Sequence, residues 1–159
     1  MSIFSQYHLN FLKTLIENGV KFLIVGGQAA IYYGVRRGTG DLDLLIEPTS
    51  QNGEKILNAF HQLNLQVDEI KPKEFEQSLF LGLGFEPDAV DILTTTPGID
   101  FKSAFERAEE IQDVNIKVKI ISIEDLIKTK ESLNRGEEKG ILDKYDVAVL
   151  KRIMKGNKT

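Results

Sequence analysis

Residues 21–49 read KFLIVGGQAAIYYGVRRGTGDLDLLIEPT, and this stretch decides the fold that we expect. Two short apolar runs in it are typical of buried strands, and the glycine pair Gly26-Gly27 directly follows the first of them. In chain order, the expected elements are a strand over 22–25, a helix over 28–33 closed by Gly34, a loop over 35–40 and a strand over 41–46. Strands that alternate with a helix at this spacing predict the α/β class.

The hydrophobic pattern on either side of this stretch predicts further helices and strands. Helices are expected up to Gly19, from Thr49 or Ser50 through Leu63, over 100–110, from Ser122 to Leu133 and over 142–154. Strands are expected over 78–85, 89–93 and 116–121, with 86–88 as the turn of a hairpin between the first two. A polar loop is expected over 134–140 and a frayed tail over 155–159. We therefore expect one α/β (α+β) domain over residues 1–159, with a mixed central sheet flanked by helices and with helices at its C-terminus.

The composition limits the class of protein. With 42% hydrophobic and 28% charged residues in 159, the chain suits one globular domain. A net charge of -4 provides no global basic field to gather nucleic acid, and the absence of cysteine excludes disulfides and thiolate chemistry. Neither a signal peptide nor an apolar run long enough for a membrane helix is evident. We therefore expect a cytoplasmic protein with no membrane partner.

Asp41 and Asp43 are the most informative pair of side chains. In a strand, residues two apart point to the same face, about 7 Å apart along the chain, while Leu42 and Leu44 point to the buried face. Like charges at that spacing repel by roughly 2–3 kcal/mol at an effective dielectric near 20, and a bound divalent cation removes this repulsion. The alternative for this pair taken alone is two solvated, inert aspartates at an exposed strand start.

Three neighbouring features favour a site for a metal ion and a phosphate group. Gly26 and Gly27 end a strand and begin a helix, where close backbone approach and free N–H groups attract anions. Asp91 lies inside the apolar strand AVDIL, where a carboxylate needs either a metal or a basic partner that would make it merely structural. Arg37 and Thr39 precede the aspartate pair and either donate hydrogen bonds to phosphate oxygens or lie in a solvated loop.

Taken together, these features resemble the DNA polymerase beta nucleotidyltransferase superfamily. The shared pattern is a glycine pair, thirteen residues, Asp-Leu-Asp and a distant aspartate in an apolar strand. Residues 21–49 resemble in particular the small bacterial nucleotidyltransferases of the AbiEii and minimal nucleotidyltransferase type. The resemblance continues through AVDILTTTPGIDF (89–101), ISIEDLIKTKESLNR (121–135) and DKYDVAVL (143–150), so that it covers residues 20–150. It implies a nucleotidyltransferase fold.

The resemblance also implies a role for each matching position. Asp41, Asp43 and Asp91 would be the catalytic residues and would bind two Mg²⁺ ions, with Mn²⁺ as an alternative, and Asp91 would help to activate the attacking hydroxyl. The residues that would contact a nucleoside triphosphate are Gly26, Gly27, Gln28, Arg37, Thr39, Lys130 and Arg135.

The sequence departs from the family pattern after Arg135. Residues 136–141 look inserted, and Leu142 stands where a lysine is expected before Asp143. Whether Arg135 reaches the site therefore depends on the structure. Asp143 and Asp146 are interpreted as helix-start residues that complement the helix dipole.

The implied activity is the transfer of a nucleoside monophosphate from a nucleoside triphosphate to a hydroxyl group. The sequence does not distinguish ATP, CTP, GTP and UTP as the nucleotide. It also does not distinguish a protein, an RNA and a small molecule as the acceptor. Small relatives of this type often act beside a partner protein in toxin–antitoxin or phage-defence pairs, and an oligomer is compatible with the small size. The main alternative is a catalytically silent nucleotide-binding or regulatory module that acts through a partner protein. A metal-dependent hydrolase or a glycosyltransferase would also use Asp-x-Asp, but neither explains the glycine pair that precedes it.

Overall fold

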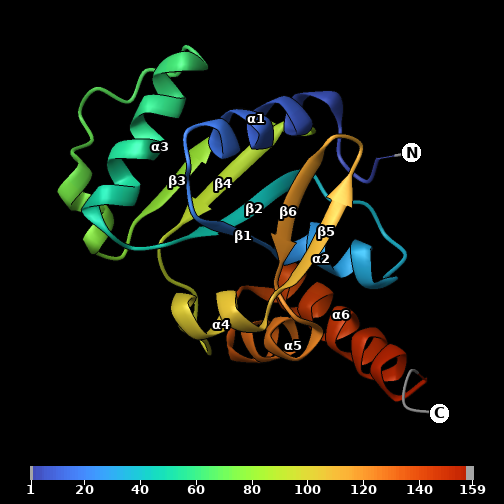
Figure 1. Ribbon diagram of the computed structural model, residues 1–159. Helices are drawn as coiled ribbons and strands as arrows, with labels where there is room; N and C mark the ends of the chain where they lie inside the picture. Colours follow the sequence, from blue (N-terminus) through green and yellow to red (C-terminus); the bar gives the residue numbers. More distant parts are fainter. Residues whose placement is uncertain (1, 157–159) are drawn as a thin grey trace.

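The computed structural model describes residues 2–156, whose strands form one mixed sheet (Figure 1). The strands are β1 (Phe22–Val25), β2 (Asp41–Ile46), β3 (Phe80–Leu83), β4 (Ala89–Leu93), β5 (Glu109–Asp113) and β6 (Ile116–Ile120). The helices are α1 (Gln6–Glu17), α2 (Gly26–Tyr33), α3 (Ser50–Gln62), the 3-10 helix η1 (Pro72–Glu76), α4 (Phe101–Arg107), α5 (Ile123–Ser132) and α6 (Glu137–Gly156). The predicted α/β class with a mixed central sheet is confirmed.

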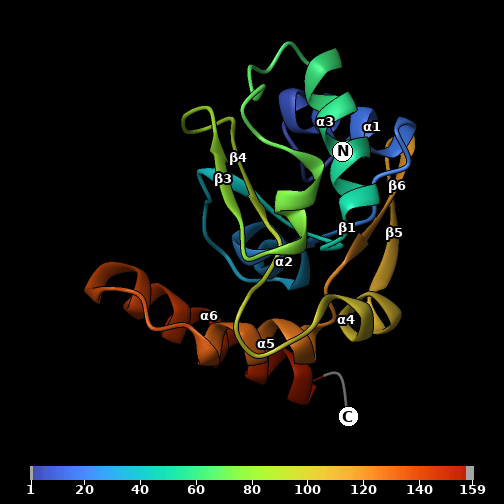
Figure 2. The ribbon, with the colours of Figure 1, turned by 90° about the vertical axis from the view of Figure 1, so that its left-hand side faces the viewer.

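The sheet has the strand order β3-β4-β2-β1-β6-β5. The pairs β2–β4 and β1–β6 are parallel, whereas β1–β2, β3–β4 and β5–β6 are antiparallel. Helices α1 and α3 lie on one side of the sheet, and α5 and α6 lie together on the other side (Figures 1 and 2). The predicted hairpin over 78–93 is present, with β3 shorter than expected.

The central strands separate a buried face from a polar one. All four residues of β1 are buried, and in β2 Leu42 and Leu44 are fully buried. Asp41 and Asp43 lie on the opposite face of β2 and are only partly buried. The predicted alternation along β2 is therefore confirmed, and it turns both carboxylates toward the side of the sheet that carries α5 and α6.

The expected helix over residues 100–110 is wrong in its last part. Helix α4 ends at Arg107, and the following residues form β5, which pairs antiparallel with β6 from Glu109↔Ile120 to Asp113↔Ile116. Glutamates favour a helix locally, but the ladder of hydrogen bonds with β6 outweighs this propensity.

The C-terminal helix is longer than expected. It begins at Glu137 rather than at residue 142, because the segment that looks inserted continues the helix, with the Gly140 N–H donating to the Gly136 carbonyl. Glu137 and Glu138 in its first turn complement the helix dipole. Lys155 and Gly156 are helical rather than frayed, and residues 157–159 of the expected tail lie outside the described residues.

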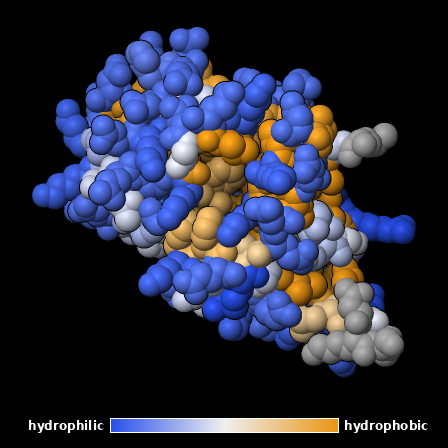
Figure 3. Space-filling model, viewed as in Figure 1, coloured by the Kyte–Doolittle hydropathy of each residue, from blue (hydrophilic) through white to orange (hydrophobic). Residues whose placement is uncertain are grey.

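In the view of Figure 3, hydrophilic residues cover most of the surface and apolar patches lie between them. Within residues 2–156, each helix is too short or too polar to span a lipid bilayer.

Candidate active site

Three carboxylates meet on the polar face of the sheet. Asp41 and Asp43 come from β2 and Asp91 comes from β4, where the parallel register places Asp43 opposite Asp91. One carboxylate oxygen from each residue lies within 4.8 Å of those of the other two. This separation matches a set of ligands that can share one or more cations.

The electrostatics of the triad favour a bound cation. Burial, together with the negative charges of Asp41 and Asp91, raises the pKa of Asp43 to about 7. Burial and the neighbouring Asp41 raise the pKa of Asp91 to about 6. The Oδ1 atom of Asp43 is buried without a hydrogen-bond partner among the described residues. A hard divalent cation would satisfy this oxygen and remove the repulsion, so the residues fit magnesium.

Binding of Mg²⁺ is expected to weaken by more than about tenfold when the pH falls from about 8 to about 5.5. Asp43 and Asp91, with pKa values of about 7 and about 6, take up protons in this range, and a protonated carboxyl is a poor cation ligand. Calorimetric titration with magnesium chloride at both pH values measures the effect. Equal affinities at the two pH values would contradict it.

Gly26 and Gly27 form the wall of the site beside the triad. Gly26 has a φ of +67°, which disfavours other residues, and a Cβ atom there would clash with the Asp43 carboxylate. A Cβ atom at Gly27 would lie 2.8 Å from the Thr39 Oγ1 and 3.0 Å from an Arg37 nitrogen. Both positions open α2, so backbone N–H groups at a helix N-terminus lie next to the carboxylates.

Three cationic side chains from other parts of the chain line the same cavity as the carboxylate triad. Arg37 follows α2, Lys130 lies in α5 and Arg135 lies between α5 and α6. Lys130 is buried, with a relative exposure of 5%. Two carboxylates of α6, Asp143 and Asp146, hold all three cations by ion pairs.

The prediction that Asp143 and Asp146 are helix-start residues is wrong. Both lie well inside α6 and are buried, and Asp146 has a relative exposure of 0%. Asp146 accepts two hydrogen bonds from Arg37, at 2.9 and 2.8 Å, and pairs with Lys130 at 2.9 Å. Asp143 accepts two from Arg135. The two aspartates therefore attach α6 to the cations of the site.

One cavity of about 500 Å³ brings most of the sequence-predicted residues together. Those that line it are Gly26, Gly27, Arg37, Thr39, Asp41, Asp43, Asp91, Lys130 and Arg135. Arg135 thus reaches the cavity despite the departure from the family pattern. Gln28 is the exception: it is buried and points elsewhere, because its Nε2 donates to the Ile3 carbonyl at 2.8 Å.

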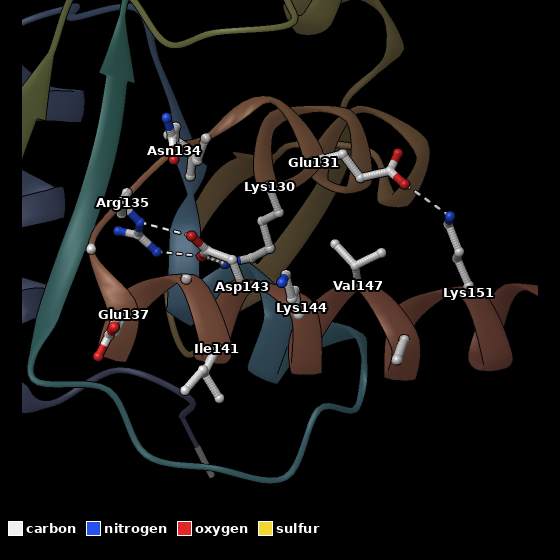
Figure 4. Close-up of a pocket in the computed structure, with 14 residues that line it drawn as sticks. Lys130, Glu131, Asn134, Arg135, Glu137, Ile141, Asp143, Lys144, Val147 and Lys151 are labelled. Atoms are coloured by element: carbon white, nitrogen blue, oxygen red, sulfur yellow. Dashed lines mark hydrogen bonds and ion pairs between the residues drawn. The ribbon is translucent and has the colours of Figure 1, made fainter.

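A second cavity, of about 1060 Å³, lies between α5 and α6 (Figure 4). It shares Lys130, Leu133 and Arg135 with the first cavity but contains none of the triad carboxylates. Figure 4 shows Arg135 directed toward Asp143 at this junction. We place the chemistry in the smaller cavity, because the carboxylates and the glycine pair are there.

Some residues that line the site were not singled out from the sequence. Phe80, Glu86 and Lys139 belong to the smaller cavity. In the hairpin, Gly82 of β3 pairs with Asp91 of β4, and Phe80 lies two residues before Gly82 on the same face of the strand. The register of the hairpin could therefore have indicated Phe80. Lys139 lies in the first turns of α6, in the segment expected to be a loop, and had no such signal.

Comparison with known proteins supports the fold. Neither a scan of the sequence against protein-family models nor a search of curated proteins finds a match. Among solved structures, the chain is similar to the crystal structure of the lincosamide antibiotic adenylyltransferase LnuA with lincomycin bound. The TM-score is 0.59 at 16% sequence identity, and the match covers 96% of this chain and 99% of that chain. At this identity the likeness shows the fold, and the predicted nucleotidyltransferase fold is confirmed.

Proposed function

We propose that this protein is a magnesium-dependent nucleotidyltransferase. The observation that carries the proposal is the meeting of Asp41, Asp43 and Asp91 beside the glycine pair, with a buried Asp43 oxygen that lacks a partner among the described residues. The shared fold with an adenylyltransferase supports it. The AbiEii-like subtype and a toxin–antitoxin or phage-defence role are extensions of this proposal.

The reaction moves one nucleotidyl group. The oxygen of the acceptor hydroxyl forms a bond to the α-phosphorus, the bond from that phosphorus to the bridging oxygen breaks, and pyrophosphate leaves. In this proposal Asp91 takes up the hydroxyl proton. Asp41, Asp43 and Asp91 would hold the magnesium ions, which neutralise charge on the triphosphate and lower the pKa of the hydroxyl when bound.

The remaining residues position the triphosphate. Backbone N–H groups of Gly26 and Gly27 bind phosphate oxygens at the N-terminus of α2. Arg37, Lys130 and Arg135 line the same cavity and supply positive charge on the side of α5 and α6. These groups hold the reactants in place, and such positioning is a major part of catalysis in phosphoryl transfer.

Labelled nucleoside triphosphates test the proposal. The protein is incubated with Mg²⁺, cell extract and each of ATP, CTP, GTP and UTP labelled on the α-phosphate. Transfer of label to a protein, RNA or small-molecule fraction is the expected result. LnuA is by name an adenylyltransferase of lincosamide antibiotics, so small hydroxylated molecules and ATP are the first pair to test. Failure of every nucleotide to bind in the presence of Mg²⁺ would overturn the proposal.

A catalytically silent regulatory module is the second candidate. One observation favours it: Asp143 and Asp146 already neutralise Arg37, Lys130 and Arg135, which leaves less free positive charge for a triphosphate. Calorimetry with ATP or CTP and Mg²⁺ separates the two functions. Metal-dependent binding without transfer of label to any fraction of the extract would favour the silent module.

A further inference from the structure

A row of paired residues crosses four strands at the centre of the site. The register places Gly82 of β3 opposite Asp91 of β4, Asp91 opposite Asp43 of β2, and Asp43 opposite Val25 at the end of β1. Gly26 follows directly. The polar face of the sheet therefore has the phosphate-binding glycines at one end of this row and a residue without a side chain at the other.

The direction of the reaction assigns one end of this row to the leaving pyrophosphate and the other end to the acceptor. This step rests on the proposed function. In phosphoryl transfer the attacking and leaving oxygens lie roughly in line on opposite sides of the phosphorus. With pyrophosphate leaving over Gly26 and Gly27, the attacking hydroxyl must arrive from the side of Asp91 and Gly82. The acceptor therefore lies over β4 and β3.

Phe80 provides an apolar surface on that side. Its partner across the hairpin is Leu93, and both residues line the cavity of the triad. Phe80 has a relative exposure of 60%, which is high for a large apolar side chain inside a cavity. A Cβ atom added at Gly82 would lie 3.5 Å from the Phe80 ring and 3.6 Å from the Asp91 Oδ1. The glycine thus leaves open space between an exposed aromatic ring and the carboxylate.

The nucleoside part of the nucleotide has room in the larger cavity, away from Phe80. The larger cavity between α5 and α6 adjoins the site at Lys130, Leu133 and Arg135, on the side of the helices rather than on β3. The surface of Phe80 is then left to the acceptor.

We propose that Phe80 and Gly82 form the acceptor subsite, in which Phe80 stacks on a ring of a small hydroxylated molecule and Gly82 admits its hydroxyl to Asp91. Aromatic side chains bind flat rings with an apolar face, and the cavity of about 500 Å³ has the size of a small-molecule site. The class of acceptor is therefore a small molecule whose reactive hydroxyl is carried on or next to a ring.

A tryptophan at position 80 tests the subsite without requiring turnover. The sequence contains no tryptophan, so Phe80→Trp introduces a single fluorescent reporter, and Phe85→Trp is the matched control. Phe85 lies in the same hairpin with a relative exposure of 90%. Phenyl glucoside, which carries hydroxyls on and next to rings, is expected to quench the emission of the first variant and not of the second. Glycerol and Mg²⁺-ATP should leave both unchanged.

Three results would overturn the subsite. Mg²⁺-ATP alone could quench the residue-80 reporter, which would make Phe80 a platform for the nucleotide base. An oligoribonucleotide could quench it more strongly than phenyl glucoside, which would assign the surface to RNA. Phenyl glucoside could affect both reporters equally. Calorimetry of Mg²⁺-ATP with the wild-type chain is run in parallel, so a failure of the proposed nucleotide binding is recognised separately.

Kinetic variants give a second reading on any acceptor found in the labelling experiment. Phe80→Ala is expected to raise the KM for the acceptor by about threefold to tenfold with the KM for the nucleotide unchanged, and Phe80→Tyr should restore it. Gly82→Ala fits without steric conflict, because its contacts would be of ordinary length, but it narrows the approach to Asp91. A rise in the KM for the nucleotide, with the KM for the acceptor unchanged, would contradict the assignment.

Discussion

Asp43→Asn is expected to reduce nucleotidyl transfer by roughly a thousandfold or more while the fold stays intact. Asp43 forms the triad with Asp41 and Asp91 and carries the buried oxygen without a partner among the described residues. Loss of that oxygen as an anionic ligand weakens cation binding. A bound metal stabilises the transition state by several kcal/mol, and each 1.36 kcal/mol lost lowers the rate about tenfold. Label transfer from the α-phosphate, measured beside far-UV circular dichroism, checks both statements.

The same substitution is expected to stabilise the metal-free protein at about pH 8. Because the pKa of Asp43 is raised to about 7 in the folded state, folding disfavours the charged carboxylate that is present above that pH. Asparagine avoids this unfavourable charge, and each kcal/mol gained raises the Tm by about 2–4 °C. Asp88→Asn, on the exposed turn of the hairpin, is the control and should change neither activity nor Tm. Wild-type transfer by Asp43→Asn would exclude the triad as the catalytic centre.

The part of the site that is local in sequence could be predicted from the sequence. Asp41 and Asp43 share a face because a strand has a period of two residues, and the pattern of Leu42 and Leu44 shows which face is buried. The glycine pair was recognisable because it stands between an apolar strand and a helix. Asp91 was marked by its apolar neighbours, but its place opposite Asp43 depends on the parallel pairing of β2 with β4.

The parts that depend on distant pairing could not be predicted in this way. Strand β5 has the composition of a helix, and only its hydrogen bonds with β6 make it a strand. Asp143 and Asp146 look like surface residues of an amphipathic helix. The fold instead places them against cations from α5, from the loop after α2 and from the segment between α5 and α6. Buried ion pairs of this kind are hard to predict from a single sequence, because each partner, taken alone, has the sequence pattern of an exposed charged residue.

Asp146→Asn is expected to be the most destabilising single substitution at the site. The carboxylate is fully buried and binds both Arg37 and Lys130. Burial alone would raise the pKa of Asp146, but the hydrogen bonds from these two cations outweigh it and hold the pKa below its usual value. The ion pairs therefore contribute stability above the usual range of an aspartate pKa, and this contribution is lost as the pH falls through the lowered value.

Removing one partner of a buried ion pair costs about 3–5 kcal/mol, so the Tm of Asp146→Asn should fall by roughly 6–20 °C at neutral pH. Glu131→Gln is the matched control, because Glu131 pairs with Lys151 at 2.8 Å across the same two helices but on the exposed surface. An exposed pair contributes about 0–1 kcal/mol, so this variant should melt close to the wild type. The KM for the nucleotide should rise only in Asp146→Asn, since Arg37 and Lys130 lose the group that holds them in the cavity. Similar melting of the two variants would show that α6 is attached to the site by its apolar contacts rather than by these charges.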